Sequence, residues 1–376
     1  MDERRRFVND WLSREWNVAE LSRFYGISRP TAYKWLERFR RSGETGLAEV
    51  TRAPKSHPNA TPAEMEAAVI QQRIKHPHWG PRKLRYCLER VQAQARWPSP
   101  TTIGEILKRH GLVAPRKRRR TMAPYPNPLS SGLQPNDVWA ADFKGWFRTG
   151  DGTRIDPLTV SDVASRYLLR CQGVPKTDGE TVRGQFTRTF QEYGLPRALR
   201  TDNGPPFASL TVAGLSRLSV WLIRLGIHPE RIEPGRPDQN GVHERMHKTL
   251  KQETAKPPKS NPRAQQAAFD RFQAEFNDER PHEALGMRPP GDFYQPSARP
   301  FPNRLPEIEY PDGTKIYKVG ENGCIHPKKT TSVFISNSLV GELVGLSQTN
   351  DNDWAVHFAW IRLGTYDSKR VTMIRV

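Results

Sequence analysis

A change of pattern near Asp137 constrains the fold of this chain more than any other feature of its sequence. Ahead of that point, apolar residues recur at helical spacing. Beyond it come three segments rich in β-branched and aromatic residues and separated by turn residues: VWAADFKGWF, RIDPLTVSDVAS and RYLLRCQGV. Helix-like and strand-like segments then alternate. Three strands followed by such an alternation predict a mixed α/β sheet, and the regions before it should be helical.

Residues 1–50 predict three short helices around one small core, the pattern of a helix-turn-helix DNA-binding domain. Gly26 stands where the tight turn needs an unhindered backbone, Ser28 can cap the next helix, and Pro30 lies in its first turn. A helical hairpin used for protein contacts is the alternative. If the third helix enters a DNA major groove, its candidate contacts are Arg29, Thr31, Lys34 and Arg38.

Residues 60–113 predict a second helical DNA-binding domain, helix-turn-helix or winged-helix-like. Ser99-Pro100-Thr101 repeats the cap-then-proline start of the first domain's third helix. Two tandem domains would cover a longer DNA site than one. The candidate contacts here are Ser99, Thr101, Thr102 and Lys108.

The positive charge of the chain is concentrated near its beginning. Residues 1–120 hold 26 Lys and Arg against 12 Asp and Glu, whereas residues 121–376 hold 33 against 28. A basic region ahead of a nearly neutral body is typical of a module that binds a polyanion such as DNA. Residues 114–136 predict a basic linker that follows a phosphate backbone or serves only as a solvated hinge. Its candidate DNA contacts are Arg116, Lys117, Arg118, Arg119 and Arg120.

Composition excludes other classes of protein. Cys87, Cys171 and Cys324 are too few and too scattered for a disulfide framework or a cysteine-rich zinc site. No apolar run approaches the roughly 18–20 residues that cross a bilayer, and the first residues do not form a signal peptide. We therefore expect no membrane partner and a cytoplasmic protein associated with the bacterial nucleoid.

Residues 305–376 alternate in short β segments with Gly and Asn turns, which predicts a small, separate β-barrel. Lysines and arginines in this segment could add contacts to a DNA backbone. A packing or oligomerising module is an equally open interpretation.

Three carboxylates occupy unusual places in the α/β region. Asp142 lies inside an apolar and aromatic strand, Asp202 ends a strand at ALRTDNG, and Glu244 follows GRPDQNG in the first turns of a helix. Burying an unpaired charge in a strand is costly, so Asp142 needs a cation. Carboxylate oxygens suit Mg²⁺ or Mn²⁺, and two such ions can activate an attacking oxygen and stabilise a leaving one.

The context of these carboxylates resembles the catalytic core of bacterial insertion-sequence transposases and retroviral integrases, the DDE family with an RNase H-like fold. Five stretches carry the resemblance in order: VWAADFKGWF, PLTVSDVASRYLL, RTDNGPPFAS, PGRPDQNGVHERMHKTLKQE and FNDERPHEALGMRPP. The expected architecture is therefore multidomain α+β. It comprises the helical domains, an RNase H-like integrase core over residues 137–295, and the C-terminal barrel.

The resemblance implies a metal-dependent polynucleotidyl transferase. Such an enzyme would bind transposon ends, cleave DNA and join the freed 3′-OH to target DNA, with two Mg²⁺ or Mn²⁺ ions per active site. Asp142, Asp202 and Glu244 would be its catalytic residues and metal ligands, and Lys248 and Lys251 would contact DNA phosphates. Its partners would be double-stranded DNA, both the terminal repeats and the target, and further copies of the chain in a dimer or larger assembly.

Several alternatives remain open from sequence alone. A DNA-binding regulator with an inactive integrase-like core is one, and a related nuclease that cuts without joining is another. Asn203, Gln239, Asn240 and His243 match family motif positions that shape the site, although His243 could equally point away. Glu253 is a nearby acidic alternative outside the motif, and we interpret Asp162 as a turn or edge residue that pairs with Arg166.

Overall fold

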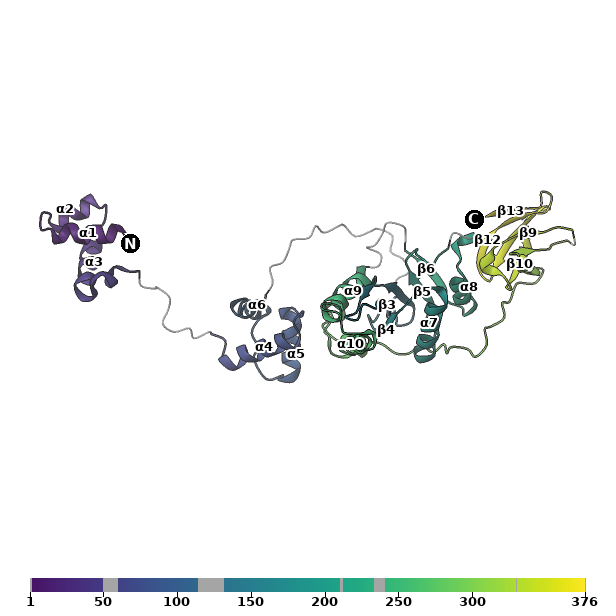
Figure 1. The fold of residues 1–376 in the computed structure, drawn as a ribbon, viewed down its shortest axis with the longest axis horizontal. Coiled ribbons are helices and arrows are strands. Elements are labelled where there is room, and N and C mark those ends of the chain that lie inside the picture. Colours follow the sequence, from purple (N-terminus) through teal and green to yellow (C-terminus); the bar gives the residue numbers. More distant parts are fainter. Residues whose placement is uncertain are drawn as a thin grey trace. The chain divides into compact units, whose positions relative to one another are not determined.

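The computed structural model describes residues 2–49, 60–113, 132–209, 212–232, 241–328 and 330–375. The chain forms two compact units, Met1–Pro62 and Ala63–Val376, and Figure 1 labels their helices and strands. None of the helices in the described ranges is long and apolar enough to cross a membrane. The basic run from Arg116 to Arg120 lies outside the described residues.

The first unit is a bundle of three helices, as its sequence predicts. Ser28 begins the last of them, because its hydroxyl accepts a hydrogen bond from the Thr31 amide at 3.3 Å. Gly26 turns the chain with a positive φ of 62°. The helices are α1 (Asp2–Leu12), α2 (Val18–Phe24) and α3 (Arg29–Ser42), closed by a 3₁₀ turn at Gly43–Leu47. Their common core consists of Phe7, Val8, Leu21, Ala32, Leu36 and Leu47.

The second unit begins with three more helices, α4 (Ala63–Lys75), α5 (Pro81–Val91) and α6 (Pro100–Arg109). The expected cap at Ser99 is present, since its hydroxyl accepts a hydrogen bond from the Thr102 amide at 3.2 Å. An apolar cluster of their own holds these helices together: Val69, Trp79, Leu84, Leu88, Trp97, Ile103, Ile106 and Leu107.

A mixed sheet forms the centre of the second unit. In spatial order its strands run β4-β3-β1-β5-β6, and the short β2 pairs antiparallel with the start of β3. β1 pairs with β3 antiparallel and with β5 parallel, so the strand that carries Asp142 is central. This arrangement matches the expected mixed sheet. The strands are β1 (Val138–Phe143), β2 (Phe147–Arg148), β3 (Arg154–Asp162), β4 (Leu168–Val174), β5 (Ala198–Thr201) and β6 (His228–Arg231).

Helices cover both faces of this sheet. Successive strand residues point to opposite faces, and Leu169 belongs to one apolar cluster whereas Leu168 belongs to another. Helices α7 (Gly179–Tyr193) and α8 (Arg217–Arg224) cover the first face; α9 (Gly241–Thr254) and α10 (Pro262–Ala274) cover the second.

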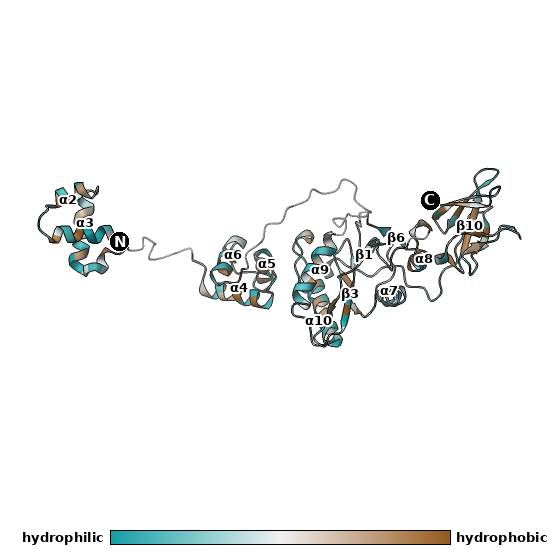
Figure 2. Cartoon of the chain, turned by 45° about the horizontal axis from the view of Figure 1, so that its top comes forward, coloured by the Kyte–Doolittle hydropathy of each residue, from teal (hydrophilic) through white to brown (hydrophobic). Residues whose placement is uncertain are grey.

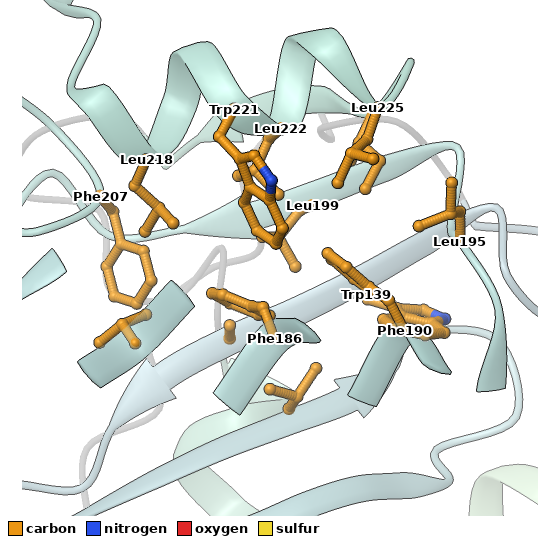
Figure 3. Packing of buried hydrophobic residues seen from close by; sticks show 14 of the residues in the cluster. Trp139, Phe186, Phe190, Leu195, Leu199, Phe207, Leu218, Trp221, Leu222 and Leu225 are labelled. Carbon is orange, nitrogen blue, oxygen red and sulfur yellow. The ribbon is translucent and has the colours of Figure 1, made fainter. Parts of the chain in front are cut away.

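Large aromatic rings fill the first face of the sheet. Phe190 of α7 lies with its ring centroid 5.9 Å from that of Trp139 on β1 and 5.7 Å from that of Trp221 on α8. Figure 3 shows these rings packed beside Leu199 and Phe186. Strand, α7 and α8 therefore share one core, which fixes β1 and β5 where Asp142 and Asp202 emerge.

The C-terminal region differs from the closed barrel that the sequence suggested. Within the described residues it is an open antiparallel sheet of order β13-β12-β11-β10-β7, accompanied by the hairpin β8-β9. Alternating short strands specify two faces but do not require the first and last strands to pair. The strands are β7 (Lys315–Lys318), β8 (Cys324–Ile325), β9 (Val333–Phe334), β10 (Leu343–Gln348), β11 (Asp353–Phe358), β12 (Ile361–Asp367) and β13 (Thr372–Arg375).

This open sheet packs on α8 and so is joined through that helix to the mixed-sheet region. Val220 and Ile223 of α8 belong to the same apolar cluster as Val344 and Phe358 of the sheet. An ion pair of 2.7 Å between Arg224 and Glu342 borders the contact. Figure 2 shows the apolar residues of β10 in brown.

Candidate active site

Asp142 and Asp202 lie at the same edge of the sheet. Asp142 is next to last in β1, and Asp202 directly follows β5, the parallel neighbour of β1. The last registered pair is Ala140 with Arg200, so two positions further the two aspartates come opposite each other. Side chains at the carboxyl ends of adjacent parallel strands meet at one edge, which is where α/β sheets bind ligands.

Glu244 reaches this edge from α9. It lies in the first turn of the helix and is exposed. Burial raises the pKa of Asp142 to about 7, and the negative charges of Asp202 and, less strongly, Glu244 contribute to that rise. The negative charges of both other carboxylates therefore act on Asp142.

A divalent cation would suit this donor set, because it would relieve the repulsion that raises the pKa of Asp142. In the described part of the chain, no group of three His, Cys, Asp or Glu side chains already stands close enough to hold an ion. Gln239 and Asn240, just ahead of α9, lie outside the described residues.

The backbone beside Asp202 leaves room next to its carboxylate. The Gly204 amide donates a hydrogen bond to Asp202 Oδ1 at 3.2 Å. A Cβ at position 204 would come within 3.2 Å of Asp202 Oδ2, closer than most side chains allow. Asn203 turns away to donate to the carbonyl of Ile232. Gly204 therefore keeps the approach to this carboxylate open.

A buried pair of histidines joins α9 to the strand next to Asp142. The Thr159 hydroxyl of β3 lies 2.6 Å from Nε2 of both His243 and His247, and it also donates toward the Asp142 carbonyl at 3.1 Å. His243 Nδ1 lies 3.1 Å from the Ser161 hydroxyl. Burial lowers the pKa of His243 to about 3 and that of His247 to about 2. Both rings are therefore neutral, and the 3.7 Å approach of His247 to Asp142 is no ion pair.

His243 thus points into the protein, and the sequence analysis missed its partners. His247 stands four residues after His243, so both lie on one face of α9. That spacing was a usable signal. Thr159 carried none, because only the packing of β3 against α9 brings it to the two rings.

The two lysines expected at the DNA line different cavities. Lys251 and Lys144 line a cavity of about 300 Å³ together with Trp146 and Phe269. Burial and then the charge of Lys251 lower the pKa of Lys144. Lys248 instead lines a cavity of about 460 Å³.

The two remaining acidic candidates have other partners. Glu253 forms an ion pair of 3.0 Å with Arg280. Asp162 accepts hydrogen bonds from the amides of Ser165 and Asn136, at 2.7 and 2.8 Å, rather than pairing with the Arg166 side chain as expected. Both carboxylates stabilise the local fold.

The expected DNA contacts in the helical domains lie at the surface. Arg29 and Lys34 of α3 are exposed, whereas Thr31 and Arg38 are half-buried. The Arg38 guanidinium lies 5.1 Å and the Lys34 ammonium 5.5 Å from the ring centroid of Trp35. At the start of and along α6, the exposed candidates are Ser99, Thr101, Thr102 and Lys108.

Four protein-family models match the chain. Two are described as integrase core domains and match residues 132–237 and 225–290. A helix-turn-helix domain model matches residues 3–55, and a homeodomain-like domain model matches residues 31–107. These matches confirm the integrase core and the helix-turn-helix region that the sequence predicts.

Related proteins come from insertion elements. An uncharacterized 39.2 kDa protein of insertion element IS476 from Xanthomonas euvesicatoria is 31% identical over 182 residues, which cover 47% of this chain and 50% of that protein. An uncharacterized 31.7 kDa protein of IS407 from Burkholderia multivorans is 26% identical over 231 residues, which cover 61% of this chain and 80% of that protein. The transposase of IS904 from Lactococcus lactis is 27% identical over 171 residues, which cover 44% of this chain and 64% of that protein. Among solved structures, the HTLV-2 integrase catalytic core in complex with magnesium aligns with 44% of this chain and 100% of its own, at 16% identity and a TM-score of 0.35.

Proposed function

We propose that this chain, which matches integrase core and helix-turn-helix models and is similar to insertion-element proteins, is a DNA transposase. It binds transposon ends, cleaves DNA and joins the 3′-OH ends to target DNA. The observation that carries this proposal is that Asp142 and Asp202 lie at one edge of the sheet, with the negative charge of Glu244 on α9 also acting on Asp142.

These three carboxylates fit a site for two Mg²⁺ or Mn²⁺ ions, which supply activation of the attacking oxygen and stabilisation of the leaving oxygen in phosphoryl transfer. Other residues of the chain would position the DNA. Gly204 leaves room beside Asp202 for the DNA backbone, and Lys144 and Lys251 offer positive charge to its phosphates.

The helical domains supply DNA recognition in this proposal. The exposed cations and hydroxyls at the starts of α3 and α6 would meet DNA, and the basic linker would follow the backbone. Cleavage and joining at two DNA ends require two active sites, so the working form is a dimer or larger assembly on DNA.

A coupled cleavage and strand-transfer assay with Mg²⁺ or Mn²⁺ tests the proposal. We expect Asp142→Asn, Asp202→Asn and Glu244→Gln each to abolish cleavage and joining while DNA binding persists. Asp351→Asn, an exposed carboxylate in the β10–β11 turn, is the matched control and should remain active.

Three outcomes would contradict the proposal in different ways. Activity that survives a carboxylate substitution would remove that residue from the site. A wild-type chain that cuts DNA but never joins the cut end would be a nuclease. One that binds DNA without cutting it, with either metal, would be the regulator that the sequence left open.

A further inference from the structure

A cavity lies beside α9, on a different flank of the helix from the one that carries Glu244. The cavity of about 460 Å³ is bordered on this helix by Arg245, Thr249 and Gln252. Glu244 and Lys251 emerge on a different flank, because successive helical residues are about 100° apart. The two flanks are therefore separated by roughly a third of a turn.

Cations crowd this cavity. Lys83 of α5, Arg166 of the β3–β4 turn, Arg245, Lys248 and Arg280 line it, whereas Glu283 is the one acidic side chain among its described lining residues. Burial and then the charge of Arg280 lower the pKa of Lys83 to about 8. The charge of Arg280 thus disfavours the positive charge of Lys83, Glu283 and Glu253 offset part of this effect, and a bound anion would relieve the rest.

Two polar atoms in the cavity wall have no hydrogen-bond partner in the described chain. They are Nη1 of Arg166 and Nε2 of His282, and both atoms are buried. Leaving a buried donor unpaired costs about 1–3 kcal/mol, so such atoms are uncommon in folded proteins. Both can donate to an oxygen of a bound anion, His282 in the tautomer that carries its proton on Nε2.

Arg166 is held toward the cavity by a constrained backbone. Its φ is +67°, a conformation that costs free energy in residues other than glycine. The turn is fixed by the Arg166 amide, which donates to the Asp162 carbonyl at 3.0 Å, and by the Ser165 contacts to the Asp162 carboxylate. The fixed turn therefore places the Arg166 side chain at the cavity.

We infer that this cavity binds one backbone phosphate of the DNA, away from the phosphate that reacts. Guanidinium groups bind phosphate through paired hydrogen bonds, and Arg166 and Arg245 line the cavity, whereas Arg280 is held by its ion pair with Glu253. The inference rests on the proposed function, which makes DNA the substrate. The cavity would thereby set the register of the DNA against the carboxylates.

The salt dependence of DNA binding by the full chain tests this site. Each phosphate contact contributes about 0.9 to the slope of log K against log salt concentration. We expect Arg166→Gln and Arg245→Gln each to lower that slope by about 1, and Arg166→Lys to lower it less. Arg245 is exposed, so its substitution should not disturb folding. Arg271→Gln on α10, also exposed, is the matched control with an unchanged slope.

Duplexes with a single methylphosphonate linkage locate the phosphate. At one position, neutralising the phosphate should weaken binding of the wild-type chain but have no further effect on Arg166→Gln. If the methylphosphonate weakens binding at one position, and only in duplexes that carry the ends of the insertion element encoding this chain, the cavity binds end DNA. A position-independent effect that also occurs in unrelated duplexes assigns it to target DNA.

Two results would overturn the inference: unchanged salt slopes in both glutamine variants, or methylphosphonate effects that add to Arg166→Gln at every position. Neither readout needs cleavage. A chain that fails to cut DNA but shows these slope changes would support the phosphate site and contradict the proposed function. An active chain without the slope changes would support the proposed function and contradict the phosphate site.

Discussion

The first helical unit and the integrase core place their polar side chains in opposite ways. Among residues 2–49, Ser22 is the one buried polar side chain, and Arg29 and Lys34 are open to solvent. The core instead buries Thr159, His243 and His247 beside its carboxylates. Loss of the surface cations is expected to weaken the proposed DNA binding, whereas loss of the buried polar groups is expected to destabilise the fold. Substitutions in the two regions should therefore fail in different assays.

The largest expected effect on stability should destabilise the integrase core and leave the first helical unit unchanged. Phe186→Ala removes a fully buried ring from the core beneath β1 and should cost about 3–5 kcal/mol of the free energy of unfolding. Urea denaturation of the full chain should show the core unfolding early while α1–α3 unfold as in the wild type. Equal shifts in both transitions would mean that the units do not fold independently.

Thr159→Val tests the buried network of the core. The valine leaves Nε2 of both His243 and His247 without the hydroxyl, so we expect a loss of about 2 kcal/mol of unfolding free energy. Ser161→Ala removes one contact to His243 and should cost about 1 kcal/mol. A Thr159→Val loss no larger than that of Ser161→Ala would mean that the hydroxyl does not hold both rings.

Acid should weaken the core and not the first unit. Burial, followed by the charges of Lys83, Arg280 and Arg166, lowers the pKa of His282 to about 3. The unfolded chain therefore binds this proton more readily than the folded one. The stability that neutral His282 contributes is complete above about pH 6.5 and is lost at about 1.4 kcal/mol per unit as the pH falls toward its folded pKa.

His282→Gln is the variant that measures this contribution. Its unfolding free energy should fall less steeply with acid than that of the wild type, by about one proton in the slope. Residues 2–49 contain no histidine, so the transition of the first unit should change little between pH 5.5 and 6.5, whereas His282 alone should remove about 1 kcal/mol from the core. Parallel pH profiles for wild type and His282→Gln would remove His282 as the cause.

The smallest stability effect is expected in the first unit. Lys34→Gln should change the free energy of unfolding by less than about 0.5 kcal/mol, since the side chain is exposed. It should nevertheless weaken DNA binding and lower its salt slope by about 1. Lys34→Arg keeps the charge and should keep the slope. A glutamine variant with wild-type DNA binding would place α3 away from the phosphates.

The elements were largely predictable from sequence because local signals specified them. Ser28 and Ser99 cap helices as expected, and Gly26 takes the left-handed turn. Strand segments and turn residues likewise located β1, β3 and β4. The sequence placed Asp142 inside its strand, whereas it is next to last in β1, and its position beside Asp202 depends on the parallel pairing of β1 with β5.

Contacts between distant segments were harder to predict. Thr159 meets His243 and His247 only because β3 packs under α9, and nothing local to any of the three specifies that contact. The pairing of Asp162 with Arg166 was wrong, since the carboxylate is satisfied by Ser165 and Asn136. Closure of the C-terminal sheet also could not be derived, because strand alternation specifies faces and not the pairing of the outermost strands.

Helix α8 belongs to two cores at once. Leu218, Trp221 and Leu222 pack against the catalytic sheet, while Val220 and Ile223 pack against the C-terminal sheet. A protein cut short before Lys315 would retain its carboxylates yet carry a bare apolar stripe on α8, the kind of surface that makes chains aggregate. For anyone isolating the integrase core, the C-terminal sheet is thus needed to cover α8 and keep the protein soluble.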